Sequence, residues 1–338
     1  MSDGSQEIDA DPFPVAPRWM LPALESFTDL SAQNRLGHAY LLIADDPQQA
    51  IMFARSVALR KLCQQGNEPP CGVCLGCRSF AQRTHGDLME VRVESGKSAI
   101  GIEQIRVASR FFQQTALYGA IKVLIIEHAE SMTPAAANSL LKTLEEPAGN
   151  SLLLLSATEV WRIPPTIRSR CQLINLALPS PEQAMAWLVD DNHWEEARAR
   201  LALSLHNGRA VSANSDDAAA PVDVLAALLE SFVSVSQGME AGSSVPTVWA
   251  SVEPSVLVYQ MMSWCEREVR ETDMPAASAH GQRWLLLHGC LTSVWSRLRS
   301  GATPGKEILS AELYRLFRSV PHPQFPWVAK QFMAMLGK

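Results

Sequence analysis

The chain has 338 residues, of which 47% are hydrophobic and 19% charged, a composition typical of a globular protein with two or three domains. Its 29 basic and 35 acidic side chains give a formal net charge of −6, which argues against a protein that binds nucleic acid on its own. No apolar run is long enough to predict a membrane-spanning helix, and the acidic N-terminus lacks the pattern of a signal peptide. We therefore expect a cytoplasmic protein.

The first half of the chain alternates short apolar runs with segments of helical spacing. The apolar runs predict strands at 39–44, 88–93, 122–126, 151–156 and 171–176. The segments between them predict helices at 48–62, 102–112 and 133–144, and the last has a threonine N-cap, Thr133, before Pro134. Because the runs are apolar on both faces, they predict a parallel sheet covered by helices on both sides, which is an α/β fold.

Four of the seven cysteines form a C-x7-C-x2-C-x2-C cluster: Cys63, Cys71, Cys74 and Cys77. Four thiolates complete the tetrahedral shell of a zinc ion and leave no open position for catalysis, so we expect one structural zinc per chain. The alternative is a set of unligated thiols or a redox-active C-x2-C pair. Cys171, Cys265 and Cys290 are isolated, and we expect them in the core.

The turn after the first strand is where an α/β domain of this kind would bind the phosphates of a nucleotide. Such a loop needs glycines, a lysine and a hydroxyl group, and this turn has none of them. It consists of Ala44, Asp45, Asp46, Pro47, Gln48, Gln49, Ala50 and Ile51. After the third strand, Glu127 could hold a metal ion, but His128 is not the usual base. We therefore expect no ATP at this site and no hydrolysis by it.

The strand signal nearly disappears after residue 180. Ser180 followed by Pro181 predicts a helix start, and the polar, alanine-rich segment 212–221 predicts a connector. Seven of the nine tryptophans lie in this half, and apolar residues recur at helical spacing, which is typical of a helix-bundle core. The expected core residues are Leu225, Leu228, Leu229, Phe232, Trp284, Leu287, Leu291, Trp295 and Leu298.

Four features together resemble the bacterial clamp-loader family of AAA+ proteins. They are the Gly-His-Ala-Tyr-Leu-Leu segment at 37–42, the cysteine cluster, the segment 132–147 with its Asn-Ser-Leu-Leu-Lys-Thr-Leu-Glu-Glu-Pro run, and the Ile-Arg-Ser-Arg-Cys segment at 167–171. The likeness is detailed over 35–178 and concerns only size and helical class beyond. It implies an AAA+ core at 1–178 with a zinc module near 60–85, a helical lid at 179–220 and a helical oligomerisation collar at 221–338.

The missing phosphate loop narrows this resemblance. ATP-hydrolysing subunits of the family, gamma and tau, keep that loop, so the chain is similar to the subunit that lacks it but keeps the zinc module. The resemblance implies a hetero-pentamer with delta and gamma/tau that loads a sliding clamp onto primer–template DNA, as part of a DNA-directed DNA polymerase III holoenzyme. No active site within this chain and no membrane contact are expected. The alternatives are an active AAA+ ATPase subunit and a zinc-containing DNA-binding protein.

The Ser169-Arg170-Cys171 motif lies just before the last predicted strand. The resemblance implies that Arg170 reaches the ATP site of a neighbouring subunit as an arginine finger, because a guanidinium fork suits the charge that develops on a transferred phosphoryl group. Ser169 would fix the loop. The alternative is a salt bridge within the chain.

Two further sets of charged residues lie on predicted helices. Lys142 is three and four residues from Glu145 and Glu146, so we expect a modest surface ion pair rather than a direct functional role. Arg106 lies on a helix that faces DNA phosphates in related subunits, and it is a candidate for that contact.

Overall fold

The computed structural model describes residues 16–33, 35–66, 69–94, 96–118, 121–147, 149–215, 222–237, 245–271, 279–300 and 305–336. The chain divides into two compact units, Met1–Trp187 and Leu188–Lys338, called here the α/β unit and the helical unit. The division into core, lid and collar stays a prediction. Within the described ranges, none of the helices combines the length and the hydropathy that crossing a bilayer requires.

The α/β unit is built on one parallel sheet of five strands, as predicted. In the order β2-β3-β4-β1-β5, the strands are Leu88–Val91, Lys122–Ile126, Ser151–Ala157, Ala39–Ala44 and Gln172–Leu176. β1 lies between β4 and β5, with Leu41 opposite Leu155 on one side and Leu173 on the other. The two edge strands are shorter than predicted, and most of β5 is exposed, because an edge strand has a neighbour on one side only.

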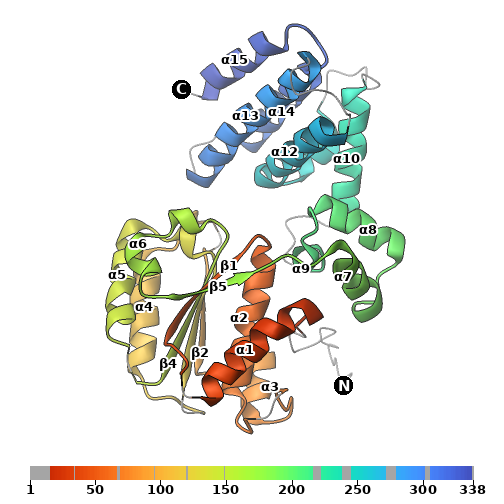
Figure 1. Cartoon of the computed structure of the whole chain (residues 1–338). Helices are drawn as coiled ribbons and strands as arrows, with labels where there is room; N and C mark the ends of the chain where they lie inside the picture. Colours follow the sequence, from red (N-terminus) through yellow and green to blue (C-terminus); the bar gives the residue numbers. More distant parts are fainter. Residues whose placement is uncertain are drawn as a thin grey trace, which may run out of the picture. The chain divides into compact units, whose positions relative to one another are not determined.

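Helices cover both faces of this sheet (Figure 1). α1 (Leu21–Ala32) and α2 (Pro47–Leu62) lie on one face, where Phe27 of α1 packs on Tyr40 of β1 with ring centroids 4.9 Å apart. α4 (Ile102–Gln113), α5 (Pro134–Glu145) and α6 (Pro165–Arg168) lie on the other face and share a core with alternate residues of the central strands. α5 begins as predicted, because the Thr133 hydroxyl accepts the amide N–H of Ala136 at 3.2 Å.

Shorter elements complete the α/β unit. They are α3 (Leu75–Ala81), α7 (Pro181–Ala186) and the 3-10 turns η1 (Arg18–Met20), η2 (Ala129–Ser131) and η3 (Val160–Arg162), with a π turn, η4 (Trp187–Asp191), at the boundary between the units. The predicted helix start at Ser180 is confirmed, because its hydroxyl accepts the amide N–H of Gln183 at 3.2 Å, and the Gln183 side chain accepts the Ser180 N–H. α1 and α3 are not among the predicted helices.

The helical unit contains no strand among its described residues. Its helices are α8 (Glu196–Leu205), α9 (Ala210–Ala213), α10 (Val222–Ser236), α11 (Thr247–Ser251), α12 (Pro254–Glu271), α13 (Ala279–Ser300), α14 (Lys306–Ser319) and α15 (Phe325–Leu336). The predicted connector at 212–221 overlaps the end of α9, and 216–221 lie outside the described residues.

Aromatic rings form the centre of the helical unit. Trp249 is fully buried, lies 5.1 Å from the ring of Phe232 and 5.7 Å from that of Phe317, and donates its indole N–H to the Ser231 hydroxyl at 2.6 Å. The predicted core residues lie in this cluster, some fully buried (Leu225, Leu228, Phe232, Trp284, Leu287, Leu291) and some partly (Leu229, Trp295, Leu298). Trp327 is 61% exposed, so the tryptophans do not all serve as core.

Candidate functional site

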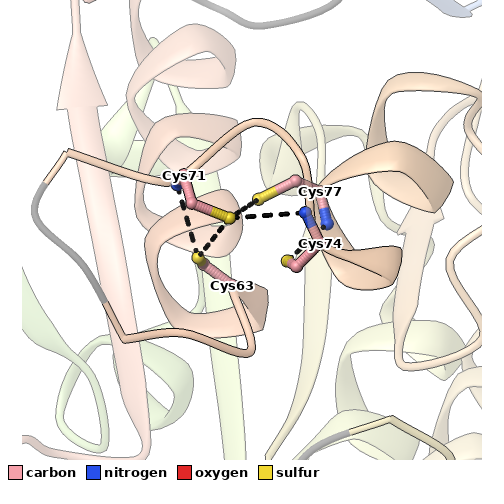
Figure 2. A group of neighbouring side chains, drawn as sticks. All are labelled: Cys63, Cys71, Cys74 and Cys77. Carbon is pink, nitrogen blue, oxygen red and sulfur yellow. Dashed lines mark hydrogen bonds between the residues drawn. The ribbon is translucent and has the colours of Figure 1, made fainter.

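The four clustered cysteines meet at one point in the α/β unit, between the end of α2 and the start of α3 (Figure 2). Their sulfur atoms all lie within 4.8 Å of one another, with Cys63 Sγ 3.7 Å from Cys71 Sγ, and Cys71 Sγ 3.9 Å from Cys77 Sγ. Four sulfurs at about 2.3 Å from a central zinc would be separated by about 3.8 Å. The observed spacing therefore fits a tetrahedral Zn(Cys)4 centre.

The backbone around the cysteines is shaped to bring them together. Gly66 and Gly72 have φ values of +61° and +71°, which let the loop between Cys63 and Cys74 reverse direction without the strain of a side chain. Gly76 lies where α3 crosses the end of α2, and a Cβ there would approach the carbonyl oxygen of Leu62 to 2.4 Å. The glycine allows the two helices to approach closely enough for the sulfurs to meet.

The protonation preferences of the thiols also suit a cation. Burial raises the pKa of Cys74, but backbone hydrogen bonds from Cys77 and Gln64 outweigh it and lower this pKa to about 6. The same balance lowers the pKa of Cys63, whose sulfur accepts the amide N–H of Cys71 at 3.5 Å. In Cys77, burial and the neighbouring thiols raise the pKa. A dication at the centre would stabilise all four as thiolates.

A buried polar anchor joins this cysteine module to the sheet. The Asp87 carboxylate, fully buried just before β2, accepts the amide N–H groups of Leu117 and Tyr118 at 2.7 and 2.8 Å and lies 3.3 Å from Lys122 Nζ. His85 Nδ1 accepts the Asp87 N–H at 3.0 Å, and its ring packs edge-on against Tyr118. The charged pair is thus fully enclosed, and its hydrogen bonds compensate the cost of burial.

At the carboxyl ends of the strands, the turn after β1 contains a buried carboxylate, that of Asp46. Asp46 is the N-cap of α2, and its Oδ1 accepts the amide N–H groups of Gln48 and Gln49 at 3.1 and 3.3 Å. These N–H groups, at the positive end of a helix, are the kind of donors that hold a nucleotide phosphate in a phosphate loop. The buried Asp46 carboxylate takes that position.

The acidic residue after β3 is also engaged. Glu127 is buried, and its Oε1 lies 3.3 Å from Nη2 of Arg55 on α2, which also makes a bidentate contact with Glu90 at 2.7 and 3.0 Å. Burial raises the pKa of Glu127 despite the nearby Arg55. The Arg55 guanidinium therefore already contacts the carboxylate that the sequence suggests as a metal ligand.

The neighbouring residue, His128, has an unusual backbone conformation. Its φ and ψ are +53° and +57°, and its N–H donates to Ser156 Oγ at 3.0 Å. Its ring Nδ1 lies 3.4 Å from Oε1 of Glu130, which also accepts the Thr158 hydroxyl at 3.0 Å. Burial raises the pKa of Glu130, but these hydrogen bonds lower it overall. The contacts of Arg55 with Glu127 and of Thr158 with Glu130 join separate elements, so no local sequence pattern indicates them.

Arg170 lies in the loop between α6 and β5 and is held within the chain. Its Nη2 lies 2.6 Å from Oε1 of Glu145, and its Nη1 donates to the Thr166 carbonyl at 3.0 Å and to Ser169 Oγ at 3.3 Å. The alternative of an intrachain salt bridge is therefore what the structure has. The pair is exposed, 37% for Arg170 and 51% for Glu145, so it leaves the guanidinium accessible.

The sheet separates Arg170 from the Asp46 turn. In a parallel sheet all strands begin on the same side. Arg170 comes two residues before β5, and Gln172 of β5 pairs with Tyr40 near the start of β1. Asp46 comes two residues after the end of β1. The six residues of β1 span about 20 Å at 3.3 Å per residue. Arg170 therefore cannot reach the nucleotide position of its own chain.

The other predicted charged contacts turn out differently. The expected ion pair of Lys142 with Glu145 or Glu146 is wrong, because Glu145 pairs with Arg170 and no ion pair of Lys142 occurs among the described residues. Arg106 is exposed and pairs with Glu103 one turn earlier on α4. Of the isolated cysteines, Cys265 and Cys290 are buried in the helical core as expected, and Cys171 is half-buried with its pKa raised to about 12 by burial.

Comparison with known proteins gives consistent matches. A family model described as DNA polymerase III, delta subunit, matches residues 21–180. DNA polymerase III subunit delta' of Haemophilus influenzae is 34% identical over 191 residues, 56% of this chain and 58% of that protein, so the match spans less than two thirds of this relative. The corresponding protein of Pseudomonas aeruginosa is 33% identical over 229 residues, 65% of this chain and 70% of that protein.

The fold has a match among solved structures as well. A DNA polymerase III gamma subunit-related protein of Thermotoga maritima superposes with a TM-score of 0.52 at 16% identity, over 88% of this chain and 98% of that one. At this identity the match concerns the fold alone, and it agrees with the predicted AAA+ architecture.

Proposed function

Because the chain belongs to the family of DNA polymerase III delta' subunits, we propose that it is a non-hydrolysing clamp-loader subunit that acts in DNA replication. It assembles with delta and gamma/tau subunits in a hetero-pentamer that uses ATP to load a sliding clamp onto primer–template DNA. Its part is that of a scaffold and of an arginine donor to a neighbouring ATP site. The names of its relatives and the likeness to a gamma-related fold support this assignment.

The geometry of the chain's own nucleotide position supports the non-hydrolysing role. A bound phosphate would have to displace the Asp46 carboxylate, which is tethered to the same helix. A magnesium ion would have to displace Arg55 from Glu127. No lysine or glycine is present in the turn to compensate either loss. Neither ATP nor magnesium is therefore expected to bind here.

The observation that carries the proposal is the position of Arg170. It lies where the strands of the sheet begin, whereas this turn lies where they end. A guanidinium at that edge can serve only a nucleotide bound by another subunit. There, its N–H donors would stabilise the negative charge on the transferred phosphoryl group as the bond to the leaving group breaks. Ser169 fixes the loop by donating its hydroxyl to the Thr166 carbonyl at 3.1 Å.

The four-cysteine cluster is proposed to hold one zinc ion with a structural role. Four protein ligands leave no position for water or substrate, so zinc would contribute folding free energy and no chemistry. Arg106 is retained as a candidate contact to DNA through the assembly, because it is exposed on α4.

The test is reconstitution of the clamp loader with Arg170→Ala, with Arg168→Ala as the matched control two residues away. Arginine fingers contribute about 10³–10⁵ in rate in well-studied GTPases. We expect Arg170→Ala to reduce DNA-stimulated ATP hydrolysis and clamp loading at least tenfold, with assembly by size exclusion and ATP affinity unchanged. Arg168→Ala should behave like the wild type.

Three results would contradict the proposal. Unchanged clamp loading with Arg170→Ala would exclude the arginine role. Tight, magnesium-dependent ATP binding by the isolated chain in a calorimetric titration would favour an active ATPase subunit. Strong, salt-dependent binding of primed DNA by the isolated chain would favour a DNA-binding zinc protein.

A further inference from the structure

The C-terminal end of α5 has two adjacent carboxylates, and the structure uses them differently. Glu145 is the last helical residue and Glu146 is the C-cap, so both lie at the negative end of the helix dipole, where carboxylates are unfavourable. Glu145 is compensated by Arg170 at 2.6 Å. Glu146 has no ion pair among the described residues. Of these two carboxylates, Glu145 is the one that the structure pairs with a guanidinium.

This end of α5 is a rigid support for such a contact. Leu144 is buried, and its carbonyl accepts a hydrogen bond from the His38 ring Nε2, 2.9 Å away at the start of β1. One residue earlier, the Thr143 hydroxyl lies 2.9 Å from that of Ser109 on α4. Glu145 is thus attached to a helix end that is held by both the sheet and the neighbouring helix.

The contacts of Arg170 leave part of its guanidinium available. Nη1 is used by the Thr166 carbonyl and the Ser169 hydroxyl, and Nη2 by Glu145. Among the described residues, the Nε–H of Arg170 has no acceptor. A guanidinium that presents Nε–H and the remaining Nη2–H on one edge can make a bidentate contact with phosphate oxygens.

We propose that Glu145 is a positioning residue for Arg170. It holds the guanidinium from one side, together with Thr166 and Ser169, and orients the free Nε edge toward the phosphate of the neighbouring subunit. The proposal rests on the arginine role proposed above and adds the residue that orients it. Glu145 itself touches no reacting atom.

The experiment uses the reconstituted clamp loader with Glu145→Gln, which keeps the size of the side chain and removes its charge. Glu146→Gln is the matched control. An exposed ion pair biases a side-chain orientation only a few-fold, so we expect Glu145→Gln to lower the kcat of DNA-stimulated ATP hydrolysis about two- to fivefold with the KM for ATP unchanged. Glu146→Gln should match the wild type. In the Arg170→Ala background, Glu145→Gln should have no further effect.

The outcomes separate this inference from the proposed function. If Arg170→Ala is defective but Glu145→Gln equals the wild type, the positioning role is wrong and the arginine role stands. If Glu145→Gln lowers kcat equally with or without Arg170, Glu145 acts elsewhere and the inference is also wrong. A rise in kcat would mean that Glu145 restrains the arginine, which contradicts positioning. If Arg170→Ala has no effect, the proposed arginine role is itself wrong, and the positioning role of Glu145 is wrong with it.

Discussion

The Asp46 carboxylate offers a direct test of the proposal that the turn after β1 holds no nucleotide phosphate. Asp46→Ala removes the side-chain oxygen that accepts the Gln48 and Gln49 N–H groups at the start of α2. Loss of an N-cap costs about 0.5–2 kcal/mol. Asp46 is fully buried and the Gln48 N–H loses its acceptor, whereas the Gln49 N–H keeps the Asp46 backbone carbonyl at 3.1 Å. We therefore expect a loss of about 1–2 kcal/mol. ATP binding should not appear, since the lysine and glycines of a phosphate loop are still missing.

The assay is hydrogen–deuterium exchange of peptides from β1 and α2 across a urea titration, which reports the free energy of unfolding of the α/β unit alone. Asp46→Asn keeps a capping oxygen and should lose far less stability than Asp46→Ala. Asp45→Ala, at the exposed neighbouring position, is the matched control and should be neutral. If Asp46→Ala is as stable as Asp45→Ala, the carboxylate does not hold the start of α2, and the proposal that it excludes a phosphate there is wrong.

Three further predictions concern the cysteine module and its anchor. Metal analysis of the purified chain should give about one zinc per molecule. Cys77→Ser should bind no zinc and should lower the stability of the cysteine module. A wild-type protein that is fully folded without metal would contradict this prediction. Gly76→Ala should destabilise the α/β unit by about 1–3 kcal/mol, because its Cβ would meet the Leu62 carbonyl. The measurement is thermal unfolding, and the control is Gly101→Ala, where a Cβ has no neighbour within 4 Å. Asp87→Asn should cost about 3–5 kcal/mol in urea unfolding, because it leaves Lys122 buried without its charge partner.

The Asp87 pair also predicts a pH dependence. Burial raises the pKa of Asp87, but the amides of Tyr118 and Leu117 and the ammonium of Lys122 lower it overall. A depressed folded-state pKa contributes stability that is present above the unfolded value of about 3.9 and is lost as the pH falls through the folded value. The free energy of unfolding of the wild type should therefore fall in acid more steeply than that of Asp87→Asn.

Much of the α/β unit could be predicted because its signals are local. The central strands are buried on both faces, so they are continuous apolar runs, and α5 starts at a threonine followed by proline. α3 was not predicted, because its N-cap is the Cys74 thiol, which accepts the Cys77 N–H and is not a usual capping group. α1 has no side-chain cap at its start, and only Leu24 and Phe27 are buried along it.

The site residues divide in the same way. The cysteine spacing is itself a local signal, and the four sulfurs do meet. The partner of Arg170 could not be predicted, because Glu145 lies 25 positions earlier in the chain and the pairing depends on how α5 ends against the sheet. Helical spacing favoured Lys142 as the partner of Glu145. The geometry of the α6–β5 loop decided otherwise.

The separation between the two edges of the sheet has a mechanical consequence. Strands packed between two layers of helices deform little, so the Arg170 edge and the Asp46 edge move as one body. A rotation of the α/β unit by about 5° around one edge would displace the other by about 2 Å, given a strand length of about 20 Å. That displacement is enough to break a hydrogen bond to a phosphate oxygen. In the proposed role, a small tilt of the α/β unit would therefore make or break the contact of Arg170 with the nucleotide of a neighbouring subunit.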